Sequence, residues 1–285
     1  MPELPEVETM RRGIAPIAGC RIVRAERPAS RYRPAPCEPS WDAALAGLTG
    51  RTIVEVGRVG KRIILALDDG SRFVFEPRMT GLALLADPPT QEHLRLVLHL
   101  AGGAADKAAF WDRRGIGTFS WFANEAELIA SRHGRIGPDA LALEASDYVR
   151  IFGKCDREIK VALLDQALIA GIGNLYASEI LHEAKIHPAK RCPTLKPAEW
   201  KRVADATRRI LEQAIRHEGS TLGDGTYRNA LNQDGSYQNC HRVYAKAGER
   251  CATCSRGVVA RVVQAQRSTF FCAVCQRAPR SPSKR

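Results

Sequence analysis

The sequence predicts an α+β protein, with an N-terminal helix and an antiparallel β-sandwich followed by a helical domain and a four-cysteine hairpin. Three observations predict this class. Apolar and polar residues alternate from about Cys20 to Phe122, apolar residues recur at three- and four-residue steps later in the chain, and two C-x-x-C pairs stand near its end.

Size and composition fit two modest domains. The chain has 285 residues, of which 45% are apolar, which is enough for two cores and unlike a disordered protein. No apolar run approaches the ~20 residues that a membrane span needs, and the acidic start is not a secretory signal. We therefore expect a cytoplasmic protein with no membrane partner.

The first residues, MPELPEVETMRRGI, predict a helix that begins near Pro5. Proline suits a first helical position, and Glu6 and Glu8 then lie in the first turn, where carboxylates offset the positive end of the helix dipole. Pro2 and Glu3 lie ahead of this turn. Helix initiation does not explain them, although taken alone they are most simply a lead into the helix.

The following segment predicts strands. RIILAL and RFVFE flank DDG, which is a hairpin signal, and HLRLVLHL and AAFWDRRGIGTFSWF are further alternating runs. A sandwich buries one face of each such strand.

After RHGRIGPDAL the pattern becomes helical. REIKVALLDQ, LYASEILHEA and EWKRVADATRRILEQAIRH all predict helices, and Gly219 stops the last one. The apolar steps of that last helix are made by Trp200, Val203, Thr207, Ile210, Leu211 and Ala214. The domain boundary is expected near 134–153, and a cleft between two domains is a natural place for a ligand.

Positive charge is concentrated at the C-terminal end. The net charge is +12, and from Arg242 onward ten lysines and arginines face a single acid, Glu249, which accounts for +9 of the total. A basic domain favours a polyanionic partner, above all nucleic acid. The last stretch, RAPRSPSKR, is expected to be a disordered tail.

Four cysteines predict a metal site. Two C-x-x-C pairs separated by a hairpin's length can arrange four thiolates tetrahedrally around one Zn²⁺ ion, and the intervening VVARVVQAQRSTFF has strand–turn–strand character. Two disulfides are the alternative, but nothing indicates an oxidising compartment. Four thiolates leave no position for water, so the zinc is expected to be structural. The predicted ligands are Cys251, Cys254, Cys272 and Cys275, whereas no pairing pattern connects Cys20, Cys37, Cys155, Cys192 and Cys240.

Several motifs together resemble the bacterial formamidopyrimidine-DNA glycosylase family. They are PELPEVE at the start, Lys61 in VGKRIILAL, RMTG at 78–81, GIGNLYASEIL at 171–181 and AQRSTFFC in the terminal hairpin. The resemblance extends from Pro2 to Gln276. It implies a bifunctional repair enzyme for double-stranded DNA, which excises oxidised purines such as 8-oxoguanine and formamidopyrimidines and then cleaves the strand by β,δ-elimination. We expect it to act as a monomer.

The resemblance also implies a domain plan. A catalytic sandwich domain is expected at 1–135, a hinge at 136–153, a helix–two-turn–helix domain with a lesion-recognition loop at 154–240, a zinc hairpin at 241–277 and the tail at 278–285. Within this plan the glycine-rich segment 219–238 is either a mobile lid over the damaged base or a simple exposed connector.

A physical reason supports a catalytic role for Pro2. If Met1 is removed, Pro2 presents a secondary amine, and an α-amino group with pKa ~8 is partly unprotonated at neutral pH, whereas lysine at ~10.4 would need strong desolvation. Attack on the anomeric carbon gives a cationic iminium that makes elimination feasible. Glu3 would shuttle protons, and Glu6 would hold the terminus or contact the sugar.

DNA contacts are implied by the same resemblance. Lys61 completes the expected catalytic set through a phosphate contact, and Asn174 and Arg267 are expected to bind phosphates, the former at a helix N-terminus. The alternative for Lys61 is a strand lysine whose stem covers apolar surface while its charge stays in solvent. The alternative for Arg267 is a solvated turn residue. A wedge of three side chains fills the space of the extruded base. The wedge residues are expected to be Met79, Arg114 and Ile116.

Two positions depart from the family pattern. The third wedge residue is Ile116 and not an aromatic, and Glu76 stands where the family commonly has a histidine, so a phosphate contact is lost there or the site is rearranged. Two other functions stay open. One is the sister glycosylase for oxidised pyrimidines, and the other is a non-catalytic DNA-binding module with a blocked N-terminus, for which a retained Met1 is the discriminating observation.

Overall fold

The computed structural model describes residues 2–32, 34–223 and 225–278. The chain forms two compact units, one made by the residues up to Arg135 together with Ala214–Gln238, the other by Ile136–Gln213 together with the residues from Asn239. Of the expected tail, 278–285, all but Ala278 lies outside the described residues. Across the described ranges, each helix is too short or too polar to cross a bilayer.

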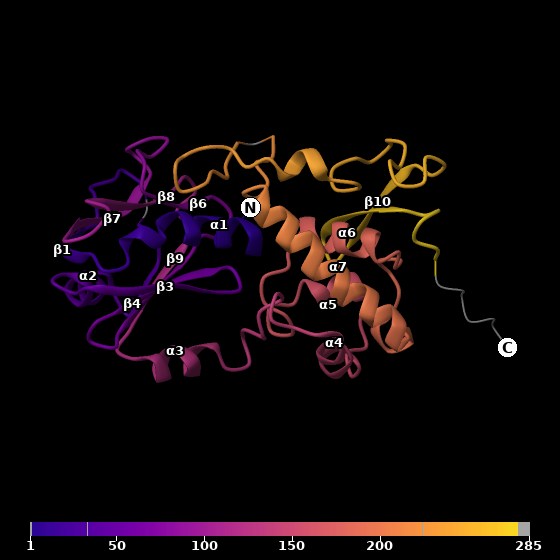
Figure 1. The fold of residues 1–285 in the computed structure, drawn as a ribbon, viewed down its shortest axis with the longest axis horizontal. Coiled ribbons are helices and arrows are strands. Elements are labelled where there is room, and N and C mark those ends of the chain that lie inside the picture. Colours follow the sequence, from indigo (N-terminus) through magenta and orange to yellow (C-terminus); the bar gives the residue numbers. More distant parts are fainter. Residues whose placement is uncertain (1, 33, 224, 279–285) are drawn as a thin grey trace. The chain divides into compact units, whose positions relative to one another are not determined.

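The first unit is built on two sheets, with strand orders β1-β7-β8-β6 and β2-β9-β5-β4-β3 (Figure 1). Its elements are α1 (Leu4–Ile14), η1 (Ala15–Ile17), β1 (Arg21–Glu26), β2 (Cys37–Glu38), α2 (Trp41–Leu48), β3 (Ile53–Val59), β4 (Arg62–Leu67), β5 (Arg72–Glu76), β6 (Gly81–Leu84), β7 (Leu94–Ala101), β8 (Lys107–Asp112), β9 (Thr118–Phe122) and α3 (Glu125–Arg132).

Buried aromatic rings join the two sheets. Phe110 of β8 makes edge-to-face contacts with Phe75 and Phe73 of β5, with ring centroids 5.1 and 6.3 Å apart, and Phe119 of β9 stacks on Phe75 at 4.9 Å. These side chains are at most 1% exposed. Rings of this size dominate the energy of a core, so the predicted sandwich is confirmed.

One strand pair is not antiparallel as predicted. β2 pairs with β9 in parallel, through Cys37↔Phe119 and Glu38↔Ser120. β2 has only two residues and is followed directly by α2, which Ser40 caps by accepting a hydrogen bond from the backbone N–H of Ala43. A strand of two residues is too short to show an alternation of apolar and polar residues, so nothing in the sequence indicated β2.

The second unit is mainly helical and ends in a hairpin. Its elements are α4 (Ala145–Phe152), α5 (Ile159–Leu163), α6 (Asn174–Glu183), η2 (Cys192–Thr194), β10 (Val259–Gln264) and β11 (Arg267–Cys272), while α7 (Pro197–Arg216) and η3 (Tyr237–Cys240) each extend across a unit boundary. Stacked rings of Phe152 and Trp200, 5.4 Å apart, pack α4 against the first turn of α7. The predicted α+β class is confirmed.

The helix predicted over REIKVALLDQ is much shorter than expected. α5 ends at Leu163, and the Asp165 carboxylate then accepts the backbone N–H of Ala167 at 2.9 Å. An aspartate that bonds to the backbone two residues on favours a turn over a helix.

Candidate active site

The N-terminal segment is fixed by a glutamate from its own helix. Pro2 and Glu3 are buried, and Glu6 accepts the backbone N–H of Glu3 through Oε2 and that of Ser220 through Oε1, both at 2.9 Å. Gly219 has φ +79°, and a Cβ there would lie 2.9 Å from the Glu6 side chain. Only glycine therefore allows the 219–220 backbone to approach the start of α1 so closely.

Helix initiation explains more of this segment than expected. Glu3 is the N-cap of α1 and forms a capping box with Glu6, while Pro5 is the second helical residue because α1 begins at Leu4. A capping box satisfies backbone N–H groups at the helix start. Pro2 lies just ahead of this box.

Lys61 lies in a turn that is tied to the same helix. Gly60 and Lys61 form the two-residue loop between β3 and β4, closed by the pair Val59↔Arg62. Arg58 donates to the Gly60 carbonyl at 2.8 Å and to the carboxylate of Glu8 at 2.9 Å. The turn that carries the half-buried Lys61 is thus connected to α1 through Arg58.

Glu8 is the centre of this connection. Burial alone raises the pKa of Glu8, but hydrogen bonds from Arg11, Arg12 and Arg58 outweigh it and lower the pKa to about 2. Its side chain is 9% exposed. Glu8 is therefore a charged anchor between α1 and the β3–β4 hairpin at neutral pH. The sequence predicted a first-turn acid here, but α1 begins at Leu4, so Glu6 is in the first turn and Glu8 is not.

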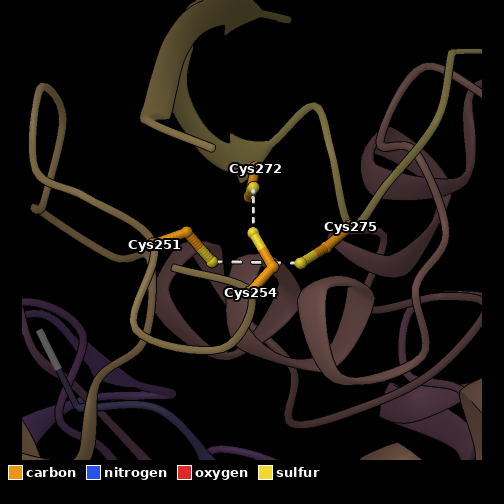
Figure 2. A group of neighbouring side chains, drawn as sticks. All are labelled: Cys251, Cys254, Cys272 and Cys275. Carbon is orange, nitrogen blue, oxygen red and sulfur yellow. Dashed lines mark hydrogen bonds between the residues drawn. The ribbon is translucent and has the colours of Figure 1, made fainter. Parts of the chain in front are cut away.

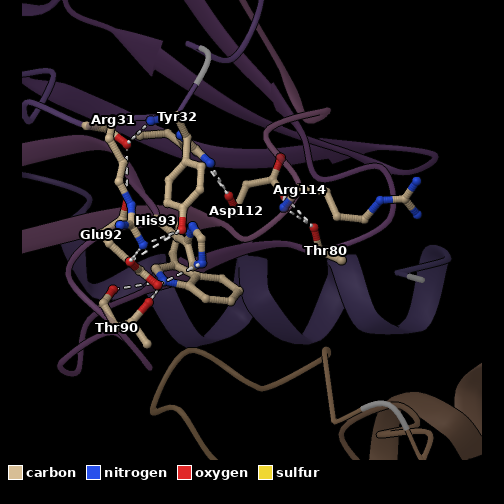
Figure 3. A network of polar contacts seen from close by, with 11 residues as sticks. Arg31, Tyr32, Thr80, Thr90, Glu92, His93, Asp112 and Arg114 are labelled. Carbon is tan, nitrogen blue, oxygen red and sulfur yellow. Dashed lines mark hydrogen bonds and ion pairs between the residues drawn. The ribbon is translucent and has the colours of Figure 1, made fainter.

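A buried aspartate joins the two loops that carry the expected wedge residues (Figure 3). Asp112 is fully buried, and its Oδ1 accepts the hydroxyl of Thr80 and, at 3.1 Å, the backbone N–H of Arg114, while Oδ2 accepts that of Gly117 at 2.7 Å. Arg95 donates to the Asp112 carbonyl at 2.8 and 3.0 Å. We call these contacts the Asp112 network.

The network leaves the expected wedge side chains at the surface. Met79 is 37% exposed and Ile116 38%, and Arg114 is exposed as well. They come from the β5–β6 and β8–β9 loops. All three side chains are therefore accessible to a partner.

Glu76 has cationic partners in this structure. Its carboxylate pairs with Arg62 at 2.7 Å and with Arg78 at 3.3 Å, and Arg78 adopts a left-handed φ of 54°. The negative charge at the position of the family histidine is thus paired with two arginines. The side chain of one of them, Arg78, is 53% exposed.

In the second unit, Asn174 is the first residue of α6 and links two elements. Its Nδ2 donates to the Ser268 carbonyl at 2.9 Å, and its Oδ1 accepts from the Lys160 ammonium at 2.6 Å. Lys160 is fully buried, a state that lysine adopts only with partners. The sequence indicated Asn174 but not Lys160, for which a lysine inside the apolar run IKVAL was the available signal.

Arg267 is exposed at the start of β11. The preceding turn consists of Ala265 and Gln266, with φ 45° and 61°, and Gln264 pairs with Arg267 across it. Two left-handed residues without glycine store backbone strain, which is frequent at functional sites.

The four predicted ligand cysteines lie together (Figure 2). Their sulfur atoms are all within 4.8 Å of one another, with Cys251 to Cys275 at 3.9 Å and Cys254 to Cys272 at 3.8 Å. A tetrahedral ion with metal–sulfur bonds of ~2.3 Å holds sulfurs about 3.8 Å apart. Hydrogen bonds from the backbone N–H groups of Gly257 and then Arg256 lower the pKa of Cys254 to about 6. The cluster is therefore compatible with a metal-ion site.

Side chains of α6 support this cluster. Glu179 accepts the backbone N–H groups of 242–244 at 2.8–3.0 Å, ahead of the first ligand pair, and burial raises the pKa of Glu179. His182 Nε2 lies 3.6 Å from the Cys251 sulfur. Partners of this kind orient metal ligands.

Sequence profiles of known families match both parts of the chain. The Formamidopyrimidine-DNA glycosylase N-terminal domain matches residues 1–119, and the Formamidopyrimidine-DNA glycosylase H2TH domain matches residues 136–225.

Individual relatives extend the similarity over nearly the whole length. The formamidopyrimidine-DNA glycosylase of Chloroflexus aurantiacus is 37% identical over 97% of this chain and 98% of its own, and that of Methylobacterium radiotolerans is 37% identical over 97% and 99%.

Solved structures agree with the sequence relatives. A point mutant of the Lactococcus lactis FPG in complex with a Fapy-dG containing DNA has a TM-score of 0.85 at 33% identity, covering 97% of this chain and all of its own. The Thermus thermophilus MutM (Fpg) protein gives 0.83 at 34%, covering 96% and 98%. The chain therefore belongs to the formamidopyrimidine-DNA glycosylase family.

Proposed function

We propose that this protein is a bifunctional DNA repair enzyme that excises oxidised purines and then cleaves the strand at the abasic site, with Pro2 as the nucleophile. The observation that carries the proposal is the N-terminal segment, where Pro2 lies buried directly ahead of a helix that Glu3 and Glu6 cap. Relatives with solved DNA complexes, titled as holding Fapy-dG or an abasic site, support the substrate class.

The chemistry begins when the Pro2 nitrogen attacks the anomeric carbon of the damaged nucleotide and displaces the base. Opening of the sugar ring gives an iminium, whose positive charge draws electrons from the neighbouring carbon and permits elimination of both phosphates. Glu3 is the adjacent acid and transfers protons to the ring oxygen and during elimination. Hydrolysis of the iminium then frees the amine.

Precise placement of the amine is the task of the surrounding contacts. Glu6 fixes the segment to the 219–220 backbone, and Glu8 with Arg58 holds the turn of Lys61 against the same helix. Misplacement by about 1 Å can cost ~100-fold in rate. Glu6, Glu8 and Arg58 are thus positioning residues, and Lys61 binds a phosphate.

Extrusion of the base depends on residues at the surface of each unit. Met79, Arg114 and Ile116 form the wedge, and Asn174 and Arg267 bind phosphates of the same DNA. Because the Asn174 side chain bonds to Lys160 and Ser268, we assign its phosphate contact to its own backbone N–H at the start of α6.

One structural zinc ion completes the proposal. Cys251, Cys254, Cys272 and Cys275 supply four thiolates, a set that zinc prefers in closed sites and that leaves no position for substrate. The ion would hold the β10–β11 hairpin, so that Arg267 is presented in one conformation. We place the monomeric enzyme in the bacterial cytoplasm, with the nucleoid DNA.

One observation favours a second substrate class. Ile116 lacks the flat face that stacks on a base, so the contacts that test the undamaged partner strand are weaker than with an aromatic residue. Activity on oxidised pyrimidines, as in the sister glycosylase, is therefore included in the test.

The test is a panel of duplexes, each with one defined lesion, incubated with enzyme in the presence of borohydride. We expect a covalent adduct with 8-oxoguanine and formamidopyrimidine duplexes, and loss of nicking in Pro2→Gly with retained DNA binding. Adducts with oxidised pyrimidines alone would establish the sister activity. Binding without any adduct, together with an intact mass that includes Met1, would establish a DNA-binding module.

A further inference from the structure

Two cysteines without a role in the proposed chemistry lie next to each other in the second unit. Cys155 follows α4, and Cys192 begins η2. An antiparallel bridge between Glu158 and Arg191 joins the two segments, and the Cys192 N–H donates to the Arg157 carbonyl at 2.9 Å. Backbone pairing therefore brings two residues 37 positions apart in sequence side by side.

The Cys155 sulfur has a charged neighbour of its own. Both thiols of the pair are reduced. The Arg157 guanidinium donates to the Cys155 sulfur at 3.3 Å, and its other end pairs with Asp165 at 2.8 Å. The sulfur of Cys155 thus accepts a hydrogen bond from a guanidinium that an ion pair with Asp165 holds in place.

The two thiols differ in access to solvent. Cys192 is 1% exposed, whereas Cys155 is partly exposed. Because Cys192 is buried, and because Cys155 lies near it, the pKa of Cys192 is raised to about 12. An exposed thiol beside a cation with a buried thiol behind it is the arrangement of redox-reactive cysteine pairs.

We propose that Cys155 and Cys192 form a peroxide-reactive dithiol that closes to a disulfide. The Cys155 thiolate attacks one oxygen of hydrogen peroxide, the O–O bond breaks, and Cys155 becomes a sulfenic acid while hydroxide leaves and is protonated to water. Cys192 then attacks the sulfenic sulfur, and its proton leaves with the hydroxyl group as a second water. Two thiols are oxidised and one peroxide is reduced to two waters.

Closure would start from the backbone pairing of the two segments. A sulfur–sulfur bond is about 2.05 Å long, so the two sulfur atoms would be brought to this distance by rotation about their Cα–Cβ bonds. The product would tie the segment after α4 to η2. This modification site does not depend on the proposed glycosylase chemistry.

The experiment treats the metal-loaded full chain with hydrogen peroxide at doses that release no metal, measured with a chromogenic chelator. Free thiols are then alkylated, and unreduced peptides are identified by mass spectrometry. We expect one linked peptide that joins Cys155 to Cys192, about tenfold or more abundant than in chain unfolded in urea, because folding holds the reacting sulfurs together. Cys37→Ser is the matched control and leaves this yield unchanged.

Two variants separate the steps. In Cys192→Ser, dimedone should label Cys155, because the sulfenic acid has no partner; in Cys155→Ser, Cys192 should stay reduced. Thermal unfolding checks that both variants fold. The proposal is overturned if wild-type protein yields both cysteines alkylated after peroxide treatment, or if the linked peptide is no more abundant in folded than in unfolded chain.

Discussion

Replacement of Asp112 by asparagine tests whether a single buried carboxylate fixes both loops that carry the proposed wedge residues. Asp112 accepts hydrogen bonds from the Thr80 hydroxyl and from the backbone N–H groups of Arg114 and Gly117. An amide retains one acceptor oxygen and places an NH₂ group against the remaining donors. A buried unsatisfied donor costs about 1–3 kcal/mol, and the other bonds lose their charge assistance. We expect a loss of about 2–4 kcal/mol in the free energy of unfolding.

Two measurements check this expectation. Urea unfolding gives the stability difference, and hydrogen exchange reports on the Arg114 and Gly117 amides, which should exchange faster in Asp112→Asn. Asp106→Asn, an exposed acid before β8, is the control and should change stability by less than about 0.5 kcal/mol. If Asp112→Asn unfolds at the same urea concentration as the wild type and protects these amides equally, the proposed role of the Asp112 network is wrong.

Three further predictions concern pH, metal and salt. The folded pKa of Glu8 is about 2 against an ordinary 4.5, so the stabilisation by its charged form is complete above pH ~4.5 and is lost as the pH falls toward 2. After solvent screening we expect Glu8→Gln to lower the free energy of unfolding in urea by about 1–2 kcal/mol at pH 6 and by less at pH 3.5. A difference that does not change with pH would contradict this. Chelation of the metal, or Cys272→Ser, should abolish DNA binding in a gel-shift assay while the near-ultraviolet signal of the sandwich persists; full affinity in metal-free protein would refute the structural role. The logarithm of DNA affinity should fall linearly with the logarithm of salt concentration, with a slope that reflects several phosphate contacts; Arg267→Gln should lower that slope by about 1, and a flat response would exclude the phosphate contacts.

Local patterns were sufficient for much of the fold. Alternation predicted β4 and β5 around their hairpin and β10 and β11 of the four-cysteine hairpin, and three- and four-residue periodicity predicted α6 and α7. Short elements were missed. The helices α2, α3 and α4 have eight residues each, so their apolar faces are too brief to give a clear period.

Site contacts between distant residues could not be predicted from the sequence. Glu6 bonds to Ser220 across 214 positions, and the partners of Asp112 include Thr80, 32 positions away. Such pairs depend on tertiary packing and leave no local signal. The four clustered cysteines are the opposite case, because C-x-x-C spacing is itself the geometric requirement of a tetrahedral metal site.

The most direct test of the central claim is to locate the covalent bond. Enzyme and 8-oxoguanine duplex are trapped with borohydride, the DNA is digested, and the modified peptide is sequenced by mass spectrometry. The account predicts a chain that starts at Pro2 and carries the reduced sugar remnant on its N-terminal nitrogen. A remnant on a lysine side chain, or a blocked N-terminus in active enzyme, would contradict it.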